Sequence, residues 1–430
     1  MKYFAAAAVL AAAVSAVDTS NHWAVIMAGS NTYSNYRHQA DTHHAVEIMI
    51  KNGIPLNQII HLAYDDIANN PSNPFPGQLF NHPATGEGVN VYNKSHIDYR
   101  GAAVNKENFF KVLLGDKTAP GPVLGSNSTS KVFVNFVDHG GAGLICTPQG
   151  SADWIYADEL NDTLQKMKNT GMFGELVFYL ETCESGSMFP NITSTEGLYA
   201  MTASIATLSS WAAYCGSDAM VNGKNIGSCL GDLFSVNWME DTEAANISSE
   251  TLEQQYETVL AKTTASPVQK FGDFSFMSEP IGDFEGNVGN SLSLFENVKR
   301  QSIAFLNDNL FGKQMNESQK VDSRDHELHF LMQQAVLNPS DENNAAVHKE
   351  LKHREFIDSV FSENFEVMAN APEIPQNFDC LRFMVGQVEE LCGPWSAYSL
   401  KYVRKLANVC DTKTEEEIAD LIAKVYNHCQ

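Results

Sequence analysis

Two short apolar runs, each ending abruptly in polar residues and glycine, constrain the fold of this chain more than any other feature. Leu176–Leu180 is followed at once by Glu-Thr-Cys183, and Val132–Val137 is followed by Asp-His139-Gly-Gly. A short, fully apolar run with turn residues behind it predicts a buried strand of a parallel sheet. In open α/β sheets, ligands bind at the carboxyl ends of the strands. We therefore expect Cys183 and His139 to lie at one such edge.

A cysteine and a histidine in this arrangement form a candidate thiolate–imidazole pair. A free thiol is only a few per cent thiolate at neutral pH, and a neighbouring imidazole raises that fraction. The same imidazole can protonate the amine that leaves a cleaved peptide. The glycines after His139 let a substrate carbonyl approach the backbone, where an N–H group can stabilise an oxyanion. The alternative is that Cys183 is inert packing, the commoner role of one cysteine at a strand end.

Strands and helices alternate along the first two thirds of the chain. This alternation predicts an α/β domain with a mostly parallel sheet flanked by helices, and we assign residues 17–286 to it. The strands are expected at 22–28, 59–64 and 197–206 and the helices at 38–52, 108–114, 156–168 and from about Asp232.

The N-terminal residues have the pattern of a secretory signal peptide. Lys2 precedes an apolar run and Val-Ser-Ala16 offers a cleavage site, so residues 1–16 are expected to be removed. No other apolar run approaches the length of a membrane span, and we expect a lysosomal, vacuolar or secreted protein with no membrane partner. Asn-x-Ser/Thr sequons agree with this routing and begin at Asn93, Asn127, Asn161, Asn191, Asn246 and Asn316.

The charge of the chain bears on its partners. A formal net charge of −24 argues against nucleic acid or an anionic membrane, because phosphate binding needs the opposite sign. It suits a protein that works in acid, where carboxylates take up protons and their repulsion relaxes. The sequence contains no P-loop, no dinucleotide-binding fingerprint and no zinc-type cluster, so we expect neither a cofactor nor a metal.

The cysteines divide the chain into regions. Four of the eight follow residue 379, as expected for a small disulfide-stapled module, and we assign 346–430 to an all-α domain. Residues 287–345 are predicted to be a polar linker with helical pieces, the longest at 327–337. Cys215 and Cys229 could bridge locally, which leaves Cys146 and Cys183 as free thiols.

Short segments spread over some two hundred residues resemble the legumain family of asparaginyl endopeptidases, which are caspase-like cysteine peptidases. The four C-terminal cysteines are similar to those of the family's prodomain. The resemblance covers nearly the whole mature chain and implies a caspase-like fold followed by a helical prodomain. The matching segments are Ala28–Asn31, Asn35–Asp41, Asn52–Pro55, Tyr64–Ile67, Asp138–Gly140, Cys183–Ser187, Leu230–Asp232 and Val236–Asp241.

The resemblance implies catalytic roles for individual residues. It implies Cys183 as the nucleophile and His139 as its partner, with Asn35 orienting the imidazole. It also implies that the N–H groups of Gly140 and Cys183 form the oxyanion hole. One position departs from the family pattern, because Thr182 stands where the family usually has alanine. We expect activity to survive this change, although the packing of the cysteine strand differs.

The resemblance further implies a specificity pocket built from Arg37, Glu181 and Asp232, with Ser209 beside them. An Asn side chain offers a carbonyl acceptor and an amide donor, which a guanidinium and two carboxylates can match. A protonated Asp presents a similar pattern, so some cleavage after Asp is expected at low pH. The alternative for each charged residue, considered singly, is a surface position or an ordinary ion pair. The alternative for Asn35 is a structural role in a turn.

A zymogen is also implied by the resemblance. The helical prodomain would cover the active site at neutral pH and leave in acid after a cut in the linker, with Asn307, Asn309 and Asn316 as candidate processing sites. The implied prodomain disulfides are Cys380–Cys410 and Cys392–Cys429, one of three pairings that four cysteines allow. Protein and peptide substrates, the chain's own prodomain and cystatin-type inhibitors are the expected partners.

Three other functions share parts of this pattern. A transamidase that attaches lipid anchors has the same His and Cys motifs, but it would need a C-terminal membrane span. A peptide ligase shares every catalytic residue with the hydrolase and differs in whether an amine or water reaches the acyl-enzyme. A catalytically dead binding protein of the same fold would have lost Cys183 or His139, and both are present.

Overall fold

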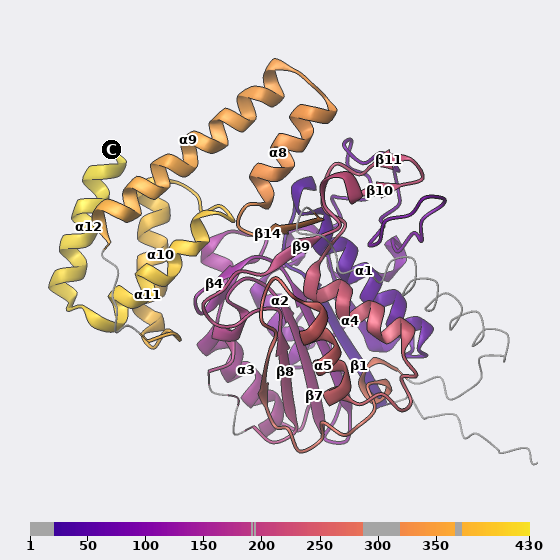
Figure 1. Ribbon diagram of the computed structural model, residues 1–430. Helices are drawn as coiled ribbons and strands as arrows, with labels where there is room; N and C mark the ends of the chain where they lie inside the picture. The colour runs from indigo at the N-terminus through magenta and orange to yellow at the C-terminus, as the bar shows by residue number, and fades with distance from the viewer. Residues whose placement is uncertain (1–20, 191, 193–194, 287–318, 366–371) are drawn as a thin grey trace, which may run out of the picture.

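The computed structural model describes residues 21–190, 192, 195–286, 319–365 and 372–430. An α/β part and a group of C-terminal helices make up these residues (Figure 1). The signal peptide predicted at 1–16 lies outside the described residues, as do Asn191 and the candidate processing sites Asn307, Asn309 and Asn316.

A six-stranded sheet forms the centre of the α/β part (Figure 1). Its strand order is β13–β8–β7–β3–β1–β2, and every neighbouring pair is parallel except β13 and β8. The fold class predicted from the sequence is therefore confirmed. The strands are β1 (His22–Ala28), β2 (Ile59–Leu62), β3 (Lys131–Val137), β7 (Glu175–Glu181), β8 (Leu198–Thr202) and β13 (Gln269–Gly272).

Helices cover both faces of the sheet and bury the two main hydrophobic cores. α2 and α3 contribute to the core on one face, and α1, α4 and α5 to the core on the other. Trp238 of α4 is fully buried in this second core, against Phe133 and Tyr179 of the central strands. These helices are α1 (Tyr36–Lys51), α2 (Lys106–Leu113), α3 (Ala157–Asn169), α4 (Leu233–Ala244), α5 (Leu252–Lys262) and the short α6 (Gly282–Glu285).

Small sheets lie beyond the carboxyl edge of the central sheet. One has the order β4–β5–β6, a second has the order β12–β9–β14, and β10 pairs with β11. Their strands are β4 (Gly140–Gly141), β5 (Leu144–Ile145), β6 (Ile155–Tyr156), β9 (Trp211–Ala213), β10 (Met220–Val221), β11 (Lys224–Asn225), β12 (Gly231–Asp232) and β14 (Lys320–Asp322).

The C-terminal region is helical, as predicted. A third hydrophobic core joins it to the α/β part, because Leu144 and Trp154 pack with Phe361, Met384 and other apolar side chains of the helices. Two disulfides, Cys380–Cys410 and Cys392–Cys429, link these helices and are the pairs expected from the resemblance. The helices are α8 (His326–Leu337), α9 (Asp341–Asn364), α10 (Phe378–Cys392), α11 (Val403–Thr412) and α12 (Glu415–Cys429).

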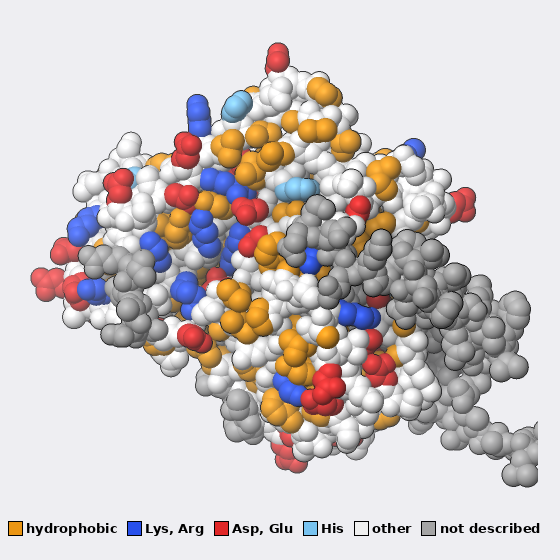
Figure 2. Space-filling view, in the orientation of Figure 1, with side chains coloured by type: hydrophobic (Ala, Val, Ile, Leu, Met, Phe, Trp, Pro, Cys, Tyr) orange, Lys and Arg blue, Asp and Glu red, His pale blue; other side chains and the backbone are white. Residues whose placement is uncertain are grey.

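The region predicted as a linker is more ordered than its polar composition indicated. Its described part contains β14 and α8, and α8 confirms the helix predicted at 327–337. α9 begins inside the predicted linker, is longer than α8 and runs through the predicted boundary at residue 346. The hairpin of α8 and α9 projects from the molecule (Figure 1), and Figure 2 shows hydrophobic side chains gathered on it. Among them Met332 is 53% exposed and Val336 76% exposed.

The structure bears on two further expectations, which concern the glycosylation sequon at Asn161 and membrane-spanning helices. Asn161 is buried, and its amide donates to the carbonyl oxygens of Ala157 and Met188 (2.8 Å for Met188), so this sequon is closed to a glycan in the folded chain. Within the described residues, no helix combines the length and apolar character needed to cross a membrane.

Candidate active site

The catalytic candidates follow two strands that pair directly with each other. β3 and β7 run parallel with Val137 opposite Glu181, so His139 and Cys183 each lie two residues beyond this pair. The chain turns sharply after Cys183, because Glu184 has a φ of 53° in the left-handed region. The register therefore brings His139 and Cys183 to neighbouring positions at the carboxyl edge of the sheet.

Gly140 packs closely against the residue that precedes the nucleophile candidate. A Cβ atom on Gly140 would lie within contact distance of Thr182 Oγ1 and 2.7 Å from the Leu144 carbonyl oxygen, so a larger residue would force the strands apart. Thr182 is fully buried, and its Oγ1 has no hydrogen-bond partner. The threonine that departs from the family pattern is thus accommodated against a glycine.

The side chain of Asn35 contacts the imidazole ring of His139. His139 Nε2 lies 2.8 Å from Asn35 Oδ1, and the Asn35 amide donates to the Asn31 carbonyl oxygen at 2.9 Å. Because the amide group of Asn35 is used as a donor, its Oδ1 must accept, so His139 carries its proton on Nε2. This tautomer leaves Nδ1 unprotonated and able to act as a base.

Cys183 is closed off from solvent. The side chain is 1% exposed, and its Sγ accepts from the Ser210 N–H at 3.4 Å with Ser210 Oγ at 3.7 Å. Burial raises the pKa of the Cys183 thiol, and the Arg324 guanidinium opposes this effect. Burial, followed by Arg37 and Arg324, lowers the pKa of His139 well below its usual value. The closed site therefore favours a neutral thiol beside a neutral imidazole.

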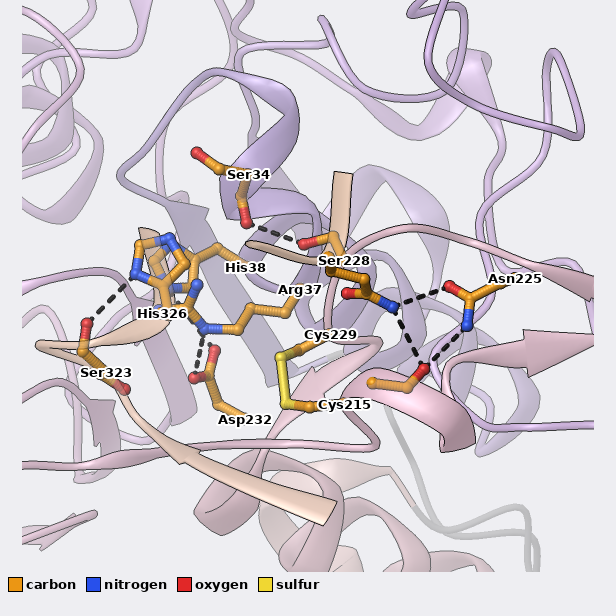
Figure 3. Close-up of a disulfide and its surroundings, with 12 residues drawn as sticks. Ser34, Arg37, His38, Cys215, Asn225, Ser228, Cys229, Asp232, Ser323 and His326 are labelled. Carbon is orange, nitrogen blue, oxygen red and sulfur yellow. Dashed lines mark hydrogen bonds and ion pairs between the residues drawn. A yellow bond between two sulfur atoms is a disulfide. The ribbon is translucent and has the colours of Figure 1, made fainter. Parts of the chain in front are cut away.

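Arg37, Glu181 and Asp232 form a buried charged pocket. Arg37 Nε donates to Asp232 Oδ1 at 2.7 Å, and Glu181 Oε2 accepts from the N–H (3.0 Å) and Oγ (3.1 Å) of Ser235. Figure 3 shows the Arg37–Asp232 pair next to His38 and a disulfide. Both terminal nitrogens of Arg37, Oε1 of Glu181 and Oδ2 of Asp232 have no hydrogen-bond partner. The cluster thus contains donors and acceptors without hydrogen bonds, although Asp232 Oδ2 lies 3.6 Å from His38 Nε2.

The carboxylates of this pocket repel one another. Burial, together with the charge of Asp232, raises the pKa of Glu181, and burial raises the pKa of Asp232 against the opposing effect of Arg37. Asp41 stands behind them, where its carboxylate accepts from the Asp232 N–H, and its own pKa is raised by burial and by Asp232. A ligand that donates hydrogen bonds here would relieve this repulsion.

A segment of the predicted linker lies across the site. β14 pairs antiparallel with β9, and the Ser323 N–H donates to the Ser210 carbonyl oxygen at 3.0 Å. Ser323 Oγ lies 3.2 Å from Ser210 Oγ, which also contacts the Cys183 sulfur. Ser209, which was expected beside the pocket residues, interacts with Asp322 of this segment.

Two histidines missed as site residues flank His139. The ring of His38 meets it edge-on at 4.9 Å between centroids, and the ring of His326 lies 5.0 Å away at the start of α8. His38 lay within a family-like segment of the sequence, whereas nothing in the sequence placed His326 or Ser210 near the nucleophile. Only the long-range pairing of β14 with β9 brings His326 to the site.

Three of these groups approach the spacing of metal ligands. His38, Asp138 and His139 offer donor atoms within 4.8 Å of one another, the one such set among the described residues. Burial lowers the pKa of both His38 and His139, and the charge of Arg37 lowers it further, so the local field opposes a cation. His38 Nδ1 also lies 2.7 Å from Ser30 Oγ. The donor set therefore does not fit a metal.

Comparisons with known proteins identify the family of this chain. Residues 22–287 match the model of the peptidase C13 family, and residues 364–429 match the model of the legumain prodomain. The chain is therefore a cysteine endopeptidase with a prodomain. It belongs to the peptidase C13 family, whose members include legumain.

Several curated relatives cover most of the chain. It is 36% identical to a vacuolar-processing enzyme of Vicia sativa over 425 residues, which cover 92% of this chain and 83% of the relative. It is 36% identical to the vacuolar-processing enzyme beta-isozyme of Arabidopsis thaliana (93% and 84% covered) and 35% identical to legumain of Canavalia ensiformis (92% and 86% covered). A match to the structure of caspase-1 from Spodoptera frugiperda has a TM-score of 0.36 and 8% identity, and it covers 63% of this chain and 92% of that chain.

The burial of Cys183 predicts slow alkylation of the intact chain. At pH 7 we expect iodoacetamide to modify Cys183 roughly a hundredfold more slowly than a free cysteine, because the thiol is enclosed and its pKa is raised. Peptide mass spectrometry would separate this adduct from one on Cys146, the other free thiol. Labelling of Cys183 at the free-cysteine rate would show that the site is open.

The Asn35–His139 contact predicts different effects of two substitutions. Asn35→Ala removes the acceptor for His139 Nε2 and should lower kcat about ten- to a hundredfold through loss of ring orientation. Asn35→Asp keeps an acceptor oxygen and should retain more activity. Equal kcat values for the wild type and Asn35→Ala would assign Asn35 a purely structural role in its turn.

Proposed function

We propose that this chain is an acid-activated endopeptidase that cleaves peptide bonds after Asn and, at low pH, also after Asp. The observation that carries the proposal is the set of unpaired polar atoms in the buried pocket. An Asn side chain has one carbonyl oxygen, which can accept from Arg37, and one NH₂ group, which can donate to Glu181 and Asp232. Each unused group of the pocket then has a partner of the right kind.

The same argument explains why other side chains would be rejected. A substrate that lacks an amide leaves buried donors and acceptors unpaired, and sites built in this way discriminate by roughly 10⁴ to 10⁵. A protonated Asp keeps a carbonyl oxygen and gains an O–H donor. Cleavage after Asp should therefore increase as the pH falls.

The proposed reaction uses the Cys183 and His139 side chains. His139 Nδ1 takes the proton of the Cys183 thiol as the sulfur attacks the carbonyl carbon of the substrate. The N–H groups of Gly140 and Cys183 donate to the resulting oxyanion. His139 then gives the proton to the departing amine, and water hydrolyses the thioester. An amine in place of water would give ligation by the same residues.

Occupation of the site by β14 supports latency. Ser323 lies beside Ser210 and Cys183, where a substrate would present its scissile bond. The serine has no amide for the pocket, so the segment can bind without being a good substrate. The helical prodomain packs on Ala142 and Leu144 of the peptidase part and adds to this cover.

A buried ion-pair cluster joins the nucleophile turn to the prodomain, and its loss would favour release. Glu184 is 5% exposed; its Oε1 accepts from Arg324 at 3.1 Å, and its Oε2 accepts from Arg404 of α11 at 2.9 Å. Breaking a buried pair by neutralising one partner costs several kcal/mol, about 3–5 in measured cases. A neutral side chain in place of Glu184 would leave two guanidinium groups at the interface without this carboxylate.

The histidines at the site favour release in the same direction. Burial lowers the pKa of His38, His139 and His326 while β14 and α8 cover them. A fold that keeps a histidine neutral has its full stability above the ordinary pKa of about 6.5 and loses it as the pH falls below that value. Acid therefore favours a state in which water reaches these rings and they can take up protons.

The remaining features of the proposal concern organisation and partners. We propose the peptidase domain at 17–286, an activation peptide at 287–345 and the prodomain at 346–430, with processing at Asn307, Asn309 or Asn316. The names of the vacuolar relatives support an acidic vacuolar or lysosomal compartment reached through the secretory pathway. Proteins and peptides with accessible Asn residues are the proposed substrates, and cystatin-type proteins the proposed inhibitors.

The pocket predicts the outcome of a peptide panel. After incubation at pH 4, the chain should cleave an Asn peptide, and Glu181→Gln should lower kcat/KM for it about a hundredfold or more by replacing one carboxylate oxygen with a donor. Matched peptides with Asp, Arg or Lys at the cleavage position, and Cys183→Ser, are the controls. Cleavage after Arg or Lys would show that the pocket is misassigned, and joined peptides would identify a ligase.

The Glu184 cluster predicts a shift in the pH of activation. Glu184→Gln removes the charge between Arg324 and Arg404, so activity should emerge at a higher pH than in the wild type. Arg382→Gln, which removes a half-exposed bridge to Asp158 across the same interface, is the matched control and should shift the profile less. The measurement is Asn-peptide cleavage after incubation at stepped pH values. Identical profiles for all three proteins would contradict an electrostatic clamp at Glu184.

A further inference from the structure

The segment that covers the site also indicates how a substrate chain would lie. β14 adds an antiparallel strand to β9, and the ladder extends beyond its three residues: the Ser323 N–H donates to Ser210, and the Cys215 N–H donates to the Gln319 carbonyl oxygen at 3.2 Å. Strand addition of this kind gives affinity through the backbone and specificity through alternate side chains. A substrate that uses the same edge would be read at every second residue.

Ser323 marks the position of the cleaved residue in this register. It contacts Ser210, whose N–H and Oγ both contact the Cys183 sulfur. The charged residues on either side of it, Asp322 and Arg324, both act on the pKa of the Cys183 thiol. Figure 3 shows Ser323 close to the Arg37–Asp232 pair. Val321 therefore stands two residues before the cleavage position.

We propose that the substrate residue two positions before the cleaved Asn binds on a surface made by Ala212, Cys215 and Cys229, and that this surface selects a branched apolar side chain. We name it the disulfide subsite. The inference rests on the proposed function, because it assumes cleavage after Asn in the register of Ser323. It assigns a specificity role to the Cys215–Cys229 bridge.

The pairing register places Val321 on the same face as the specificity pocket. Val321 is opposite Ala212, and Ala212 is opposite Asp232 on the other side of β9. Directly opposed residues of antiparallel strands share a face, so these three side chains form one row. Ala212 at the middle of the row leaves room for the branched side chain of Val321, and Asp232 continues the row into the pocket.

The disulfide forms the rest of the subsite. Ala212 and Cys215 are fully buried and Cys229 is 4% exposed, and Val321 is the apolar side chain packed on this cluster within the described residues. The bridge joins the end of β9 to the residues before β12, and Figure 3 shows it beside the Arg37–Asp232 pair. This floor offers no charged group to a substrate side chain. An Asp or Lys there would lose hydration without gaining a partner.

The neighbouring residues of the segment point to the other face and contact polar groups. Asp322 interacts with Ser209, and the Lys320 ammonium donates to Thr264 Oγ1 at 3.1 Å. The position just before the cleaved residue is therefore expected to tolerate a charge. The two adjacent positions can therefore be compared in matched peptides, with the first as the test and the second as the control.

The test is a set of Asn peptides cleaved by the full chain after incubation at pH 4. Peptides Lys-Xaa-Ala-Asn carry Val, Thr, Ala or Asp at the tested position, and the control peptides Lys-Ala-Xaa-Asn carry the same residues one position later. We expect kcat/KM for Val to exceed that for Asp roughly tenfold or more in the first set, since burying a Val side chain is favourable by more than one decade in affinity. In the control set the ratio should stay within about threefold.

The outcomes separate this inference from the proposed function. Cleavage after Asn with equal kcat/KM throughout the first set would overturn the disulfide subsite and leave the proposed function intact. Cleavage after another residue, or none, would overturn the proposed function first and this inference with it. Equal selectivity in both peptide sets would place recognition outside the pairing register and would also overturn the subsite.

Variants at two positions give readouts that do not depend on total activity. Ala212→Val adds two methyl groups opposite the substrate side chain, so the Val-to-Ala ratio of kcat/KM should fall at least about tenfold. In the intact chain at pH 7, the protection of backbone amides 320–322 against hydrogen exchange should fall at least about tenfold in Val321→Asp. The same protection should be kept in Val321→Thr. An unchanged ratio in Ala212→Val, or equal protection in both Val321 variants, would overturn the inference.

Discussion

The parallel pairing of β3 with β7 is the constraint on which the rest of the structure depends. Because Val137 lies opposite Glu181, His139 and Cys183 leave the sheet side by side, and Glu181 itself ends its strand in the pocket. A slip of one residue would turn each side chain of a strand to the opposite face. The apolar runs that fix this register therefore also position the proposed catalytic pair and Glu181 of the proposed pocket.

The site contains buried charged groups with atoms that lack hydrogen bonds, and a bound ligand can supply the missing partners. Arg37, Glu181 and Asp232 are buried with unused hydrogen-bonding atoms, a costly arrangement in a folded protein. Such groups are retained where a ligand completes their pairing. β14 fills the neighbouring edge of β9 without offering an amide, so the closed chain covers the site and leaves the pocket chemistry unused. The proposed recognition and the proposed latency thus use one surface.

Much of the fold could be predicted because it depends on local patterns. Short stretches of sequence are enough to identify the apolar runs of β1, β3 and β7. The same holds for the capping box of Thr414 with Glu417 at the start of α12. β14 could not be found in this way, since a three-residue strand in a polar segment has no periodicity and exists through its pairing with β9, more than a hundred residues earlier. His326 was missed for the same reason. Family resemblance supplied the pocket residues, but not the position of Ser209 beside Asp322.

The most direct test of the account is the reaction of Cys183 with an Asn-bearing peptidyl chloromethyl ketone, followed by peptide mass spectrometry after incubation at pH 4. The thiolate displaces chloride, so the adduct reports both the nucleophile and the pocket. The account predicts an adduct on Cys183 and none on Cys146, formed at least about a hundredfold faster than with the Leu reagent of similar size. Equal rates for the two reagents, or an adduct on Cys146, would contradict it.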